Sequence, residues 1–276
     1  MRVEGASSGL TTCQVFENVV AVKRTRVKNR ADFLRELSVL QHLGKKLHSH
    51  DHVVKLLASY EQHDYLCLVL PWAEMDLAEY WETKDPRTCQ DQPALSTWLR
   101  EQCSGLAEVV SHIHRYIPFG RHGDIKPNNI LWFPHASSVK TSTPGLGTLK
   151  LSDFGTTGSG DRKPSSSQDS YTVPYSRTYQ PPECRLPNAK LSAACDVWAL
   201  GCVFLEFVCW YVGGYKLLQD FERQRDTIYG ASCFFVINFA GSAELNPPVV
   251  EVSAIHVDYE TRPNDCLLDD SEATEV

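Results

Sequence analysis

The sequence has no excess of positive charge. Its 276 residues carry 27 Lys and Arg against 34 Asp and Glu, which gives a formal net charge of −7. Proteins that bind along nucleic acids neutralise the phosphates with clustered Lys and Arg. The one basic run, Lys23 to Arg30, is short. We therefore expect no nucleic-acid partner.

Signs of an oxidising compartment are also missing. No two of the ten cysteines form a Cys-x-x-Cys pair, and the N-terminus has no apolar segment of the signal-peptide kind. We expect reduced thiols and an intracellular location, cytoplasmic or nuclear. Cys195, Cys202 and Cys209 recur every seven residues, which favours packing along one face of a helix over metal binding.

No long apolar run is free of interruption. The most apolar stretch, residues 197–215, is almost long enough to cross a bilayer, but Glu206 lies in its middle and Gly213 and Gly214 near its end. We expect a buried helix and no membrane partner. The alternating His48, His50 and His52 have no cysteine nearby, so a loop is favoured over a zinc site.

The sequence does contain a β-rich part followed by a helical part. Branched residues predict the strands, and apolar residues recurring every three or four positions predict the helices. The predicted elements are strands at 15–16 and 19–22, a helix at 32–43, strands at 53–60 and 65–70, a helix at 94–114 and a strand at 148–151. Beyond residue 230 the pattern fades, and the acidic stretch 265–275 is predicted to be disordered.

Residues suited to phosphoryl transfer follow one another in a fixed order. The segment His122–Asn129 reads His-Gly-Asp-Ile-Lys-Pro-Asn-Asn, and Asp153-Phe154-Gly155 and Pro182-Glu183 come after it. Upstream, Lys23 ends the predicted strand Val-Ala-Val-Lys, and Glu36 lies in the predicted helix. Each motif alone is a weak signal, but their joint order is specific. From about residue 15 to 218 the chain resembles the eukaryotic protein kinase superfamily.

The resemblance implies an α+β fold with two lobes, the first small and β-rich with one helix, the second larger and mainly helical. The implied parts are an N-lobe over 1–70 that lacks its start, a hinge over 71–73, a C-lobe over 74–240 and a divergent, disordered tail over 241–276. The resemblance also implies ATP and Mg²⁺ as cofactors and a protein as substrate.

The resemblance assigns catalytic and metal-binding roles. Asp124 would orient the substrate hydroxyl and take its proton, and Lys126 would contact the γ-phosphate of ATP. Asn129 and Asp153 would bind Mg²⁺. Lys23 would grip the α- and β-phosphates. Its carboxylate partner would be Glu36, one turn before Leu40 on the same helix face.

The same resemblance places residues around the adenine. Ala21 and Leu131 would flank the ring, and Leu70 would be the gatekeeper. At the hinge, the Pro71 carbonyl would accept the adenine amine, since proline has no N–H to donate. Ala73 would supply a backbone N–H.

The remaining assignments are structural. A spine that links the lobes would contain Leu40, Leu56, His122 and Phe154. Asp196 would hold the catalytic loop by its backbone amides. Glu183 would close the activation segment, with Arg262 as the candidate partner.

Three features depart from the family pattern. Gly5 and Gly9 are the only candidates for the glycine-rich phosphate cover, and they lie too close to Lys23, so we expect a chain truncated in this element. The usual closing helices at the C-terminal end are short or missing. Gly123 replaces an arginine that binds activation-loop phosphate. The loop positions then left without a cationic clamp are Ser165, Ser166, Ser167, Ser170 and Thr172.

Three functions stay open on the sequence. Lys126 favours a protein kinase with Ser or Thr acceptors over Tyr. The missing glycine cover favours a pseudokinase or scaffold that still binds nucleotide. The His-Gly-Asp spelling is similar to the aminoglycoside and choline phosphotransferases, which act on small molecules. Residues 200–207 are similar to divergent fungal kinase domains.

Overall fold

The computed structural model covers the whole chain, and its described residues are 10–15, 18–45, 49–117, 120–134, 145–157, 176–186, 192–226, 232–238 and 241–252. Some positions singled out above lie outside these ranges. They are Gly5, Gly9, His48, Ser165, Ser166, Ser167, Ser170, Thr172, Arg262 and the stretch 265–275.

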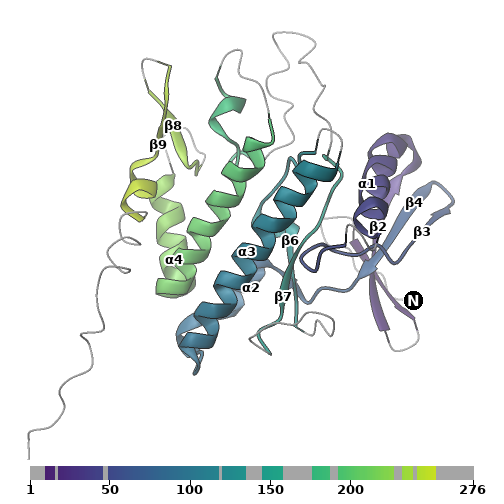
Figure 1. Ribbon diagram of the computed structural model, residues 1–276, viewed down its shortest axis with the longest axis horizontal. Helices are drawn as coiled ribbons and strands as arrows, with labels where there is room; N and C mark the ends of the chain where they lie inside the picture. Colours follow the sequence, from purple (N-terminus) through teal and green to yellow (C-terminus); the bar gives the residue numbers. More distant parts are fainter. Residues whose placement is uncertain are drawn as a thin grey trace, which may run out of the picture.

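The first part of the chain is a four-stranded antiparallel sheet with one helix against it (Figure 1). Its elements are β1 (Leu10–Val15), β2 (Asn18–Arg26), α1 (Arg30–Leu43), β3 (Ala58–Gln62) and β4 (Tyr65–Pro71). The strand order is β1-β2-β4-β3. The inner strand β4 is apolar and buries Leu66 and Leu68, whereas the edge strand β3 is exposed along its length. The predicted helix 32–43 and strand 65–70 are confirmed.

The second part is larger and mainly helical. Its elements are β5 (Met75–Asp76), α2 (Leu77–Thr83), α3 (Gln92–Tyr116), β6 (Ile130–Phe133), β7 (Thr148–Leu151), α4 (Ala194–Arg225), β8 (Phe235–Ile237) and β9 (Ala243–Leu245). Short 3-10 turns occur at η1 (Val27–Asn29), η2 (Pro86–Thr88), η3 (Pro127–Asn129) and η4 (Pro182–Cys184). A small sheet with the order β5-β6-β7 lies between the helices and the first sheet (Figure 1).

The strand predicted over residues 53–60 is wrong at its start. β3 begins only at Ala58. Val53 instead forms a single bridge with Leu151 of β7, and the Val54 N–H donates to the Leu151 carbonyl at 3.0 Å. Both valines are buried. Their apolar, branched side chains are needed in the core beside β7, so the segment crosses from one sheet to the other before it joins β4.

The two long helices extend beyond their predicted ends. Helix α3 begins earlier because the Asp91 side chain caps it, accepting from the Ala94 N–H at 2.9 Å. Helix α4 continues past Gly214, whose φ of 70° marks a kink that a residue with a side chain would adopt only with strain.

Helix α4 is the one helix within the described ranges that has the length and composition to cross a membrane. Core helices of soluble proteins can have the same length and composition, and half of the most apolar part of α4 is buried inside the protein. Asp196 and Glu206, both in α4, are buried among other side chains of the fold. Packing in the core therefore accounts for the apolar character of this helix.

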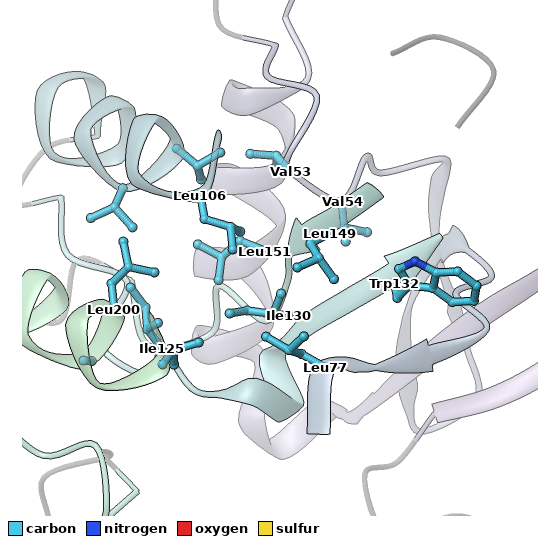
Figure 2. Close-up of a cluster of buried hydrophobic side chains, with 14 of the residues drawn as sticks. Val53, Val54, Leu77, Leu106, Ile125, Ile130, Trp132, Leu149, Leu151 and Leu200 are labelled. Carbon is cyan, nitrogen blue, oxygen red and sulfur yellow. The ribbon is translucent and has the colours of Figure 1, made fainter. Parts of the chain in front are cut away.

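The core of the second part lies directly behind the small sheet. Figure 2 shows side chains from α2, α3, α4, the small sheet and the loops beside it meeting in one cluster. The labelled members are Val53, Val54, Leu77, Leu106, Ile125, Ile130, Trp132, Leu149, Leu151 and Leu200. Ile125 separates Asp124 from Lys126 and is almost completely buried. The cluster therefore anchors the loop that carries the predicted catalytic residues.

His52 joins this core to the segment that enters the first sheet. Its Nδ1–H donates to the Leu149 carbonyl at 2.7 Å, and its ring lies against Gly105, where an added Cβ would come within 2.2 Å of Nε2. Burial lowers the pKa of His52, although the Leu149 carbonyl opposes this effect. His50 and His52 lie in a loop as predicted. Among the described residues, no three or more His, Cys, Asp or Glu side chains gather in a way that could hold a metal ion.

The depressed pKa of His52 predicts a stability that depends on pH. The unfolded chain, in which histidine titrates near pH ~6.5, takes up the proton before the folded protein does. The contribution of neutral His52 is therefore complete above pH ~6.5 and is lost below it, by at most about 1.4 kcal/mol per pH unit. The free energy of unfolding, measured with urea at pH 7.5 and 5.5, should differ less between the two pH values in His52→Asn than in the parent. The asparagine amide can still donate to the Leu149 carbonyl.

The control is His63→Asn, which changes an exposed histidine at a φ of 52° that asparagine accepts. This variant should keep the pH dependence of the parent. If His52→Asn also keeps it in full, His52 does not carry the effect.

A buried ion pair ties the end of α4 to its middle. Arg225 donates to Glu206 at 2.8 Å, and the Tyr179 hydroxyl donates to the other oxygen of Glu206 at 2.7 Å. The Arg225 guanidinium also lies 3.9 Å from the ring centre of Phe234 and 4.3 Å from that of Phe221. Burial raises the pKa of Glu206, and the charge of Arg225 opposes it. The pair thus links α4, the segment 176–186 and the residue just before β8.

Removing Arg225 should destabilise the protein strongly. Arg225→Met leaves the Glu206 carboxylate buried without a cation, which costs about 3–5 kcal/mol in comparable pairs. Chemical denaturation should show this loss, and Arg225→Met combined with Glu206→Gln should recover part of it. Arg223→Met is the control, because the Arg223–Asp220 pair is exposed and contributes about 1 kcal/mol or less. A double variant no more stable than Arg225→Met would contradict the expectation.

Candidate active site

Lys23 joins three parts of the fold. It lies on β2, and its Nζ donates to both oxygens of Glu36 from α1 at 2.9 Å. The same Nζ donates at 2.7 Å to Oδ1 of Asp153, which lies two residues after β7. The predicted partners Lys23 and Glu36 are therefore in contact, and Asp153 completes the group. The Lys23 cation links the first sheet and its helix to the metal-binding motif predicted in the second part.

The charges of this group depend on one another. Burial lowers the pKa of Lys23, but the Glu36 and Asp153 carboxylates together outweigh it and leave that pKa above its usual value. The pKa of Glu36 lies above its usual value, because the effect of burial is larger than the opposing effect of the Lys23 charge. Burial also acts to raise the pKa of Asp153, but Lys23 overrides it and leaves that pKa below its usual value. Lys23 and Asp153 are therefore the firmly ionised pair.

Asp153 is held in an unusual backbone conformation. Its φ is 61°, in the left-handed region that residues other than glycine rarely adopt. Strained residues of this kind persist only where the surrounding contacts hold them, and they cluster at functional sites. The Asp153 side chain is 44% exposed, so its carboxylate is accessible to a ligand while Lys23 holds one oxygen.

The catalytic loop brings Asp124, Lys126 and Asn129 together. Lys126 Nζ donates to Asp124 Oδ2 at 2.8 Å, and Asn129 Nδ2 donates to the same oxygen at 2.9 Å and to the Asp124 carbonyl at 2.8 Å. The other oxygen, Asp124 Oδ1, is buried and has no hydrogen-bond partner among the described residues. An unpaired carboxylate oxygen is suited to accept a proton from a hydroxyl placed against it.

Asp196 fixes the backbone of this loop. Its carboxylate is fully buried at the start of α4 and accepts from the His122 N–H at 2.7 Å and the Gly123 N–H at 2.9 Å. His114 Nε2 lies 2.9 Å from the same carboxylate. The predicted anchor is therefore in contact with both amides. His114 adds a third contact that no sequence pattern indicated.

The predicted spine residues are buried or packed against the same core. The rings of His122 and Phe154 lie 5.1 Å apart, nearly edge to face. Leu40 is buried in the core cluster with Phe154, and Leu56 is half-buried against it. His122 Nε2 also lies 3.0 Å from the carbonyl of Ser152, which is not one of the predicted spine residues.

The residues predicted around the adenine come from adjoining strands. Ala21 of β2 pairs with Leu70 of β4, and the ladder continues to Pro71, opposite Val20. Ala73 follows β4 and, like Leu131 of β6, packs against the core while partly exposed. Ala21 and Leu70 are thus neighbours in the structure.

Glu183 lies half-buried in η4, and its predicted partner Arg262 is outside the described residues. The contacts that sequence reasoning missed are those of His114, Ser152 and Thr156, whose hydroxyl donates to the His122 carbonyl. Ser152 had one usable signal, because it directly precedes the Asp-Phe-Gly motif. His114 and Thr156 stand outside the family motifs quoted above.

The site thus contains the Lys23 cation with its carboxylate partner Glu36, two candidate metal ligands and a candidate general base. A family model described as protein kinase domain matches residues 4–229, which is most of the chain. The match covers the group around Lys23, the catalytic loop and the Asp196 anchor. The chain therefore belongs to the protein kinase family.

Proposed function

We propose that this kinase transfers the γ-phosphate of ATP to Ser or Thr hydroxyls of protein substrates. The observation that carries the proposal is the unpaired oxygen of Asp124, buried in a loop where Lys126 holds the other oxygen at 2.8 Å. Lys126 lies two residues after the aspartate, where the family resemblance favours Ser and Thr acceptors. That the chain is related to divergent fungal kinase domains, as residues 200–207 suggest by their similarity, stays a prediction.

Each residue would then have one task. Asp124 would orient the acceptor hydroxyl and take its proton, and Lys126 would contact the transferred phosphate. Lys23, held by Glu36, would bind the α- and β-phosphates. These interactions position the reactants and stabilise charge, which is the main contribution of protein groups to phosphoryl transfer.

The donors present fit Mg²⁺. Asn129 and Asp153 offer an amide oxygen and an accessible carboxylate, the hard oxygen ligands that this ion prefers. The Asn129 amide nitrogen is engaged by Asp124, which leaves its oxygen for the ion. When bound, the ion would neutralise phosphate charge. The adenine would lie between Ala21 and Leu131, against Leu70 and the hinge over residues 71–73.

The wider setting is part of the same proposal. We assign an N-lobe to residues 1–70, a hinge to 71–73 and a C-lobe to 74–240. An intracellular location is supported by the eight free cysteines within the described ranges. Neither a nucleic acid nor a membrane is proposed as a partner.

MgATP should stabilise the folded protein. A ligand at about 100 times its Kd adds about 2.7 kcal/mol, which corresponds to a shift in Tm of roughly 5–10 °C for a chain of this size. Thermal unfolding with ATP should show this shift with Mg²⁺ and a smaller one with EDTA. Asp153→Ala should lose most of the shift, whereas Asp64→Ala, in an exposed turn, should keep it. The absence of any shift in the parent would refute nucleotide binding at this site.

Phosphate transfer should depend on Asp124. Radiolabelled transfer from ATP to a mixed protein substrate should fall by about 10²–10⁴-fold in Asp124→Asn, because the general base is lost. Phosphoamino-acid analysis should find label on Ser and Thr. Equal incorporation by parent and variant would remove the catalytic role of Asp124. MgATP binding without transfer would indicate a pseudokinase, and transfer only to an aminoglycoside or choline would indicate a small-molecule enzyme.

A further inference from the structure

Thr156 contacts the catalytic loop next to Gly123, which has a left-handed backbone conformation. Its hydroxyl donates to the His122 carbonyl at 2.5 Å. The next residue, Gly123, has a φ of 83°, and a Cβ added there would lie 3.2 Å from Thr156 Oγ1. A side chain at position 123 would therefore be both strained and crowded. Glycine at this position lets the threonine side chain pack closely against the loop.

The segment that contains Thr156 is held from the opposite side as well. Arg35 of α1 donates to the Gly155 carbonyl at 3.1 Å and to Asp32 at 3.0 Å. The Thr157 N–H donates to the Phe154 carbonyl at 3.1 Å and closes a turn. Residues 155–157 are thus fixed between helix α1 and the catalytic loop.

This arrangement bears on Asp153, three residues before Thr156. Asp153 has a left-handed backbone that only surrounding contacts can maintain. On its upstream side, the Ser152 N–H and Oγ both donate to the Asn129 carbonyl at 2.9 Å. On its downstream side, the Thr156 hydroxyl donates to the His122 carbonyl of the catalytic loop. The His122 backbone is in turn fixed by Asp196.

We propose that Thr156 is a positioning residue: its hydroxyl, through the His122 carbonyl, holds Asp153 in place relative to Asp124. Asp153 is the predicted metal ligand and Asp124 the predicted base, so their relative placement decides how a bound nucleotide meets the acceptor. The predicted effect of Thr156 on kcat rests on the proposed kinase function. The predicted effect on the order of residues 153–157 rests on the geometry alone.

The experiment compares Thr156→Val, which keeps the shape but removes the donor, with Thr156→Ser, which keeps the donor. Thr88→Val is the matched control, because the Thr88 hydroxyl donates to the Asp85 carbonyl at 2.7 Å on the exposed surface. For each protein we would measure amide hydrogen exchange over residues 122–126 and 153–157. Tm, and kcat and KM for ATP and protein substrate, would be measured on the same samples.

Thr156→Val should exchange faster at residues 153–157 and lower kcat about tenfold, as expected for a lost hydrogen bond that matters in the reacting complex. KM for the protein substrate and Tm should change little. Thr156→Ser should restore the exchange and bring kcat within about twofold of the parent. Thr88→Val should match the parent in every measurement.

The outcomes separate this inference from the proposed function. If the parent transfers no phosphate but Thr156→Val alone loosens residues 153–157, the positioning role holds and the kinase proposal fails. If the parent is active and Thr156→Val exchanges and reacts like it, the positioning role is wrong. A failure of Thr156→Ser to restore either property would also overturn it, because the hydroxyl would then not be the cause.

Discussion

The buried carboxylate of Asp196 is the interaction on which the site depends. A carboxylate taken out of water is costly unless hydrogen-bond donors surround it. Here the His122 and Gly123 amides and the His114 ring meet it at the start of α4. Two of the donors are backbone groups, so satisfying the charge also fixes the loop conformation, including the left-handed Gly123. The polar atoms inside α4 therefore organise the catalytic loop as well as the core.

A second ionic group extends this order to the first sheet. Lys23 is shared by Glu36 and Asp153, which lie on α1 and after β7. Burial lowers the pKa of the lysine, and the two carboxylates together outweigh this effect and leave that pKa above its usual value. The Lys23 cation thus holds α1 and the Asp-Phe-Gly segment together by bonding to a carboxylate from each. Phe154 adds an apolar contact by packing on His122.

Much of the site was predictable because phosphoryl transfer restricts residue type and order. Lys23, Glu36, Asp124 and Asn129 were selected as motifs, and the structure brings each pair together. Helix positions followed from apolar periodicity, while the ends depended on caps such as Asp91. The strand start at Val53 was wrong because a branched apolar segment reads the same whether it forms a ladder or a single bridge. Long-range partners such as Arg225 and Glu206 leave no local pattern.

Gly123 shows how the structure changes the meaning of a sequence departure. In the sequence it counted only as a missing arginine, and so as a lost clamp for a phosphate. In the structure its φ of 83° and absent Cβ admit the Thr156 side chain, whose hydroxyl then bonds to the neighbouring carbonyl. A side chain at 123 would strain the backbone and bring its Cβ to 3.2 Å from Thr156 Oγ1. The glycine and the threonine therefore act as a pair, 33 positions apart, and neither can be interpreted from its own motif.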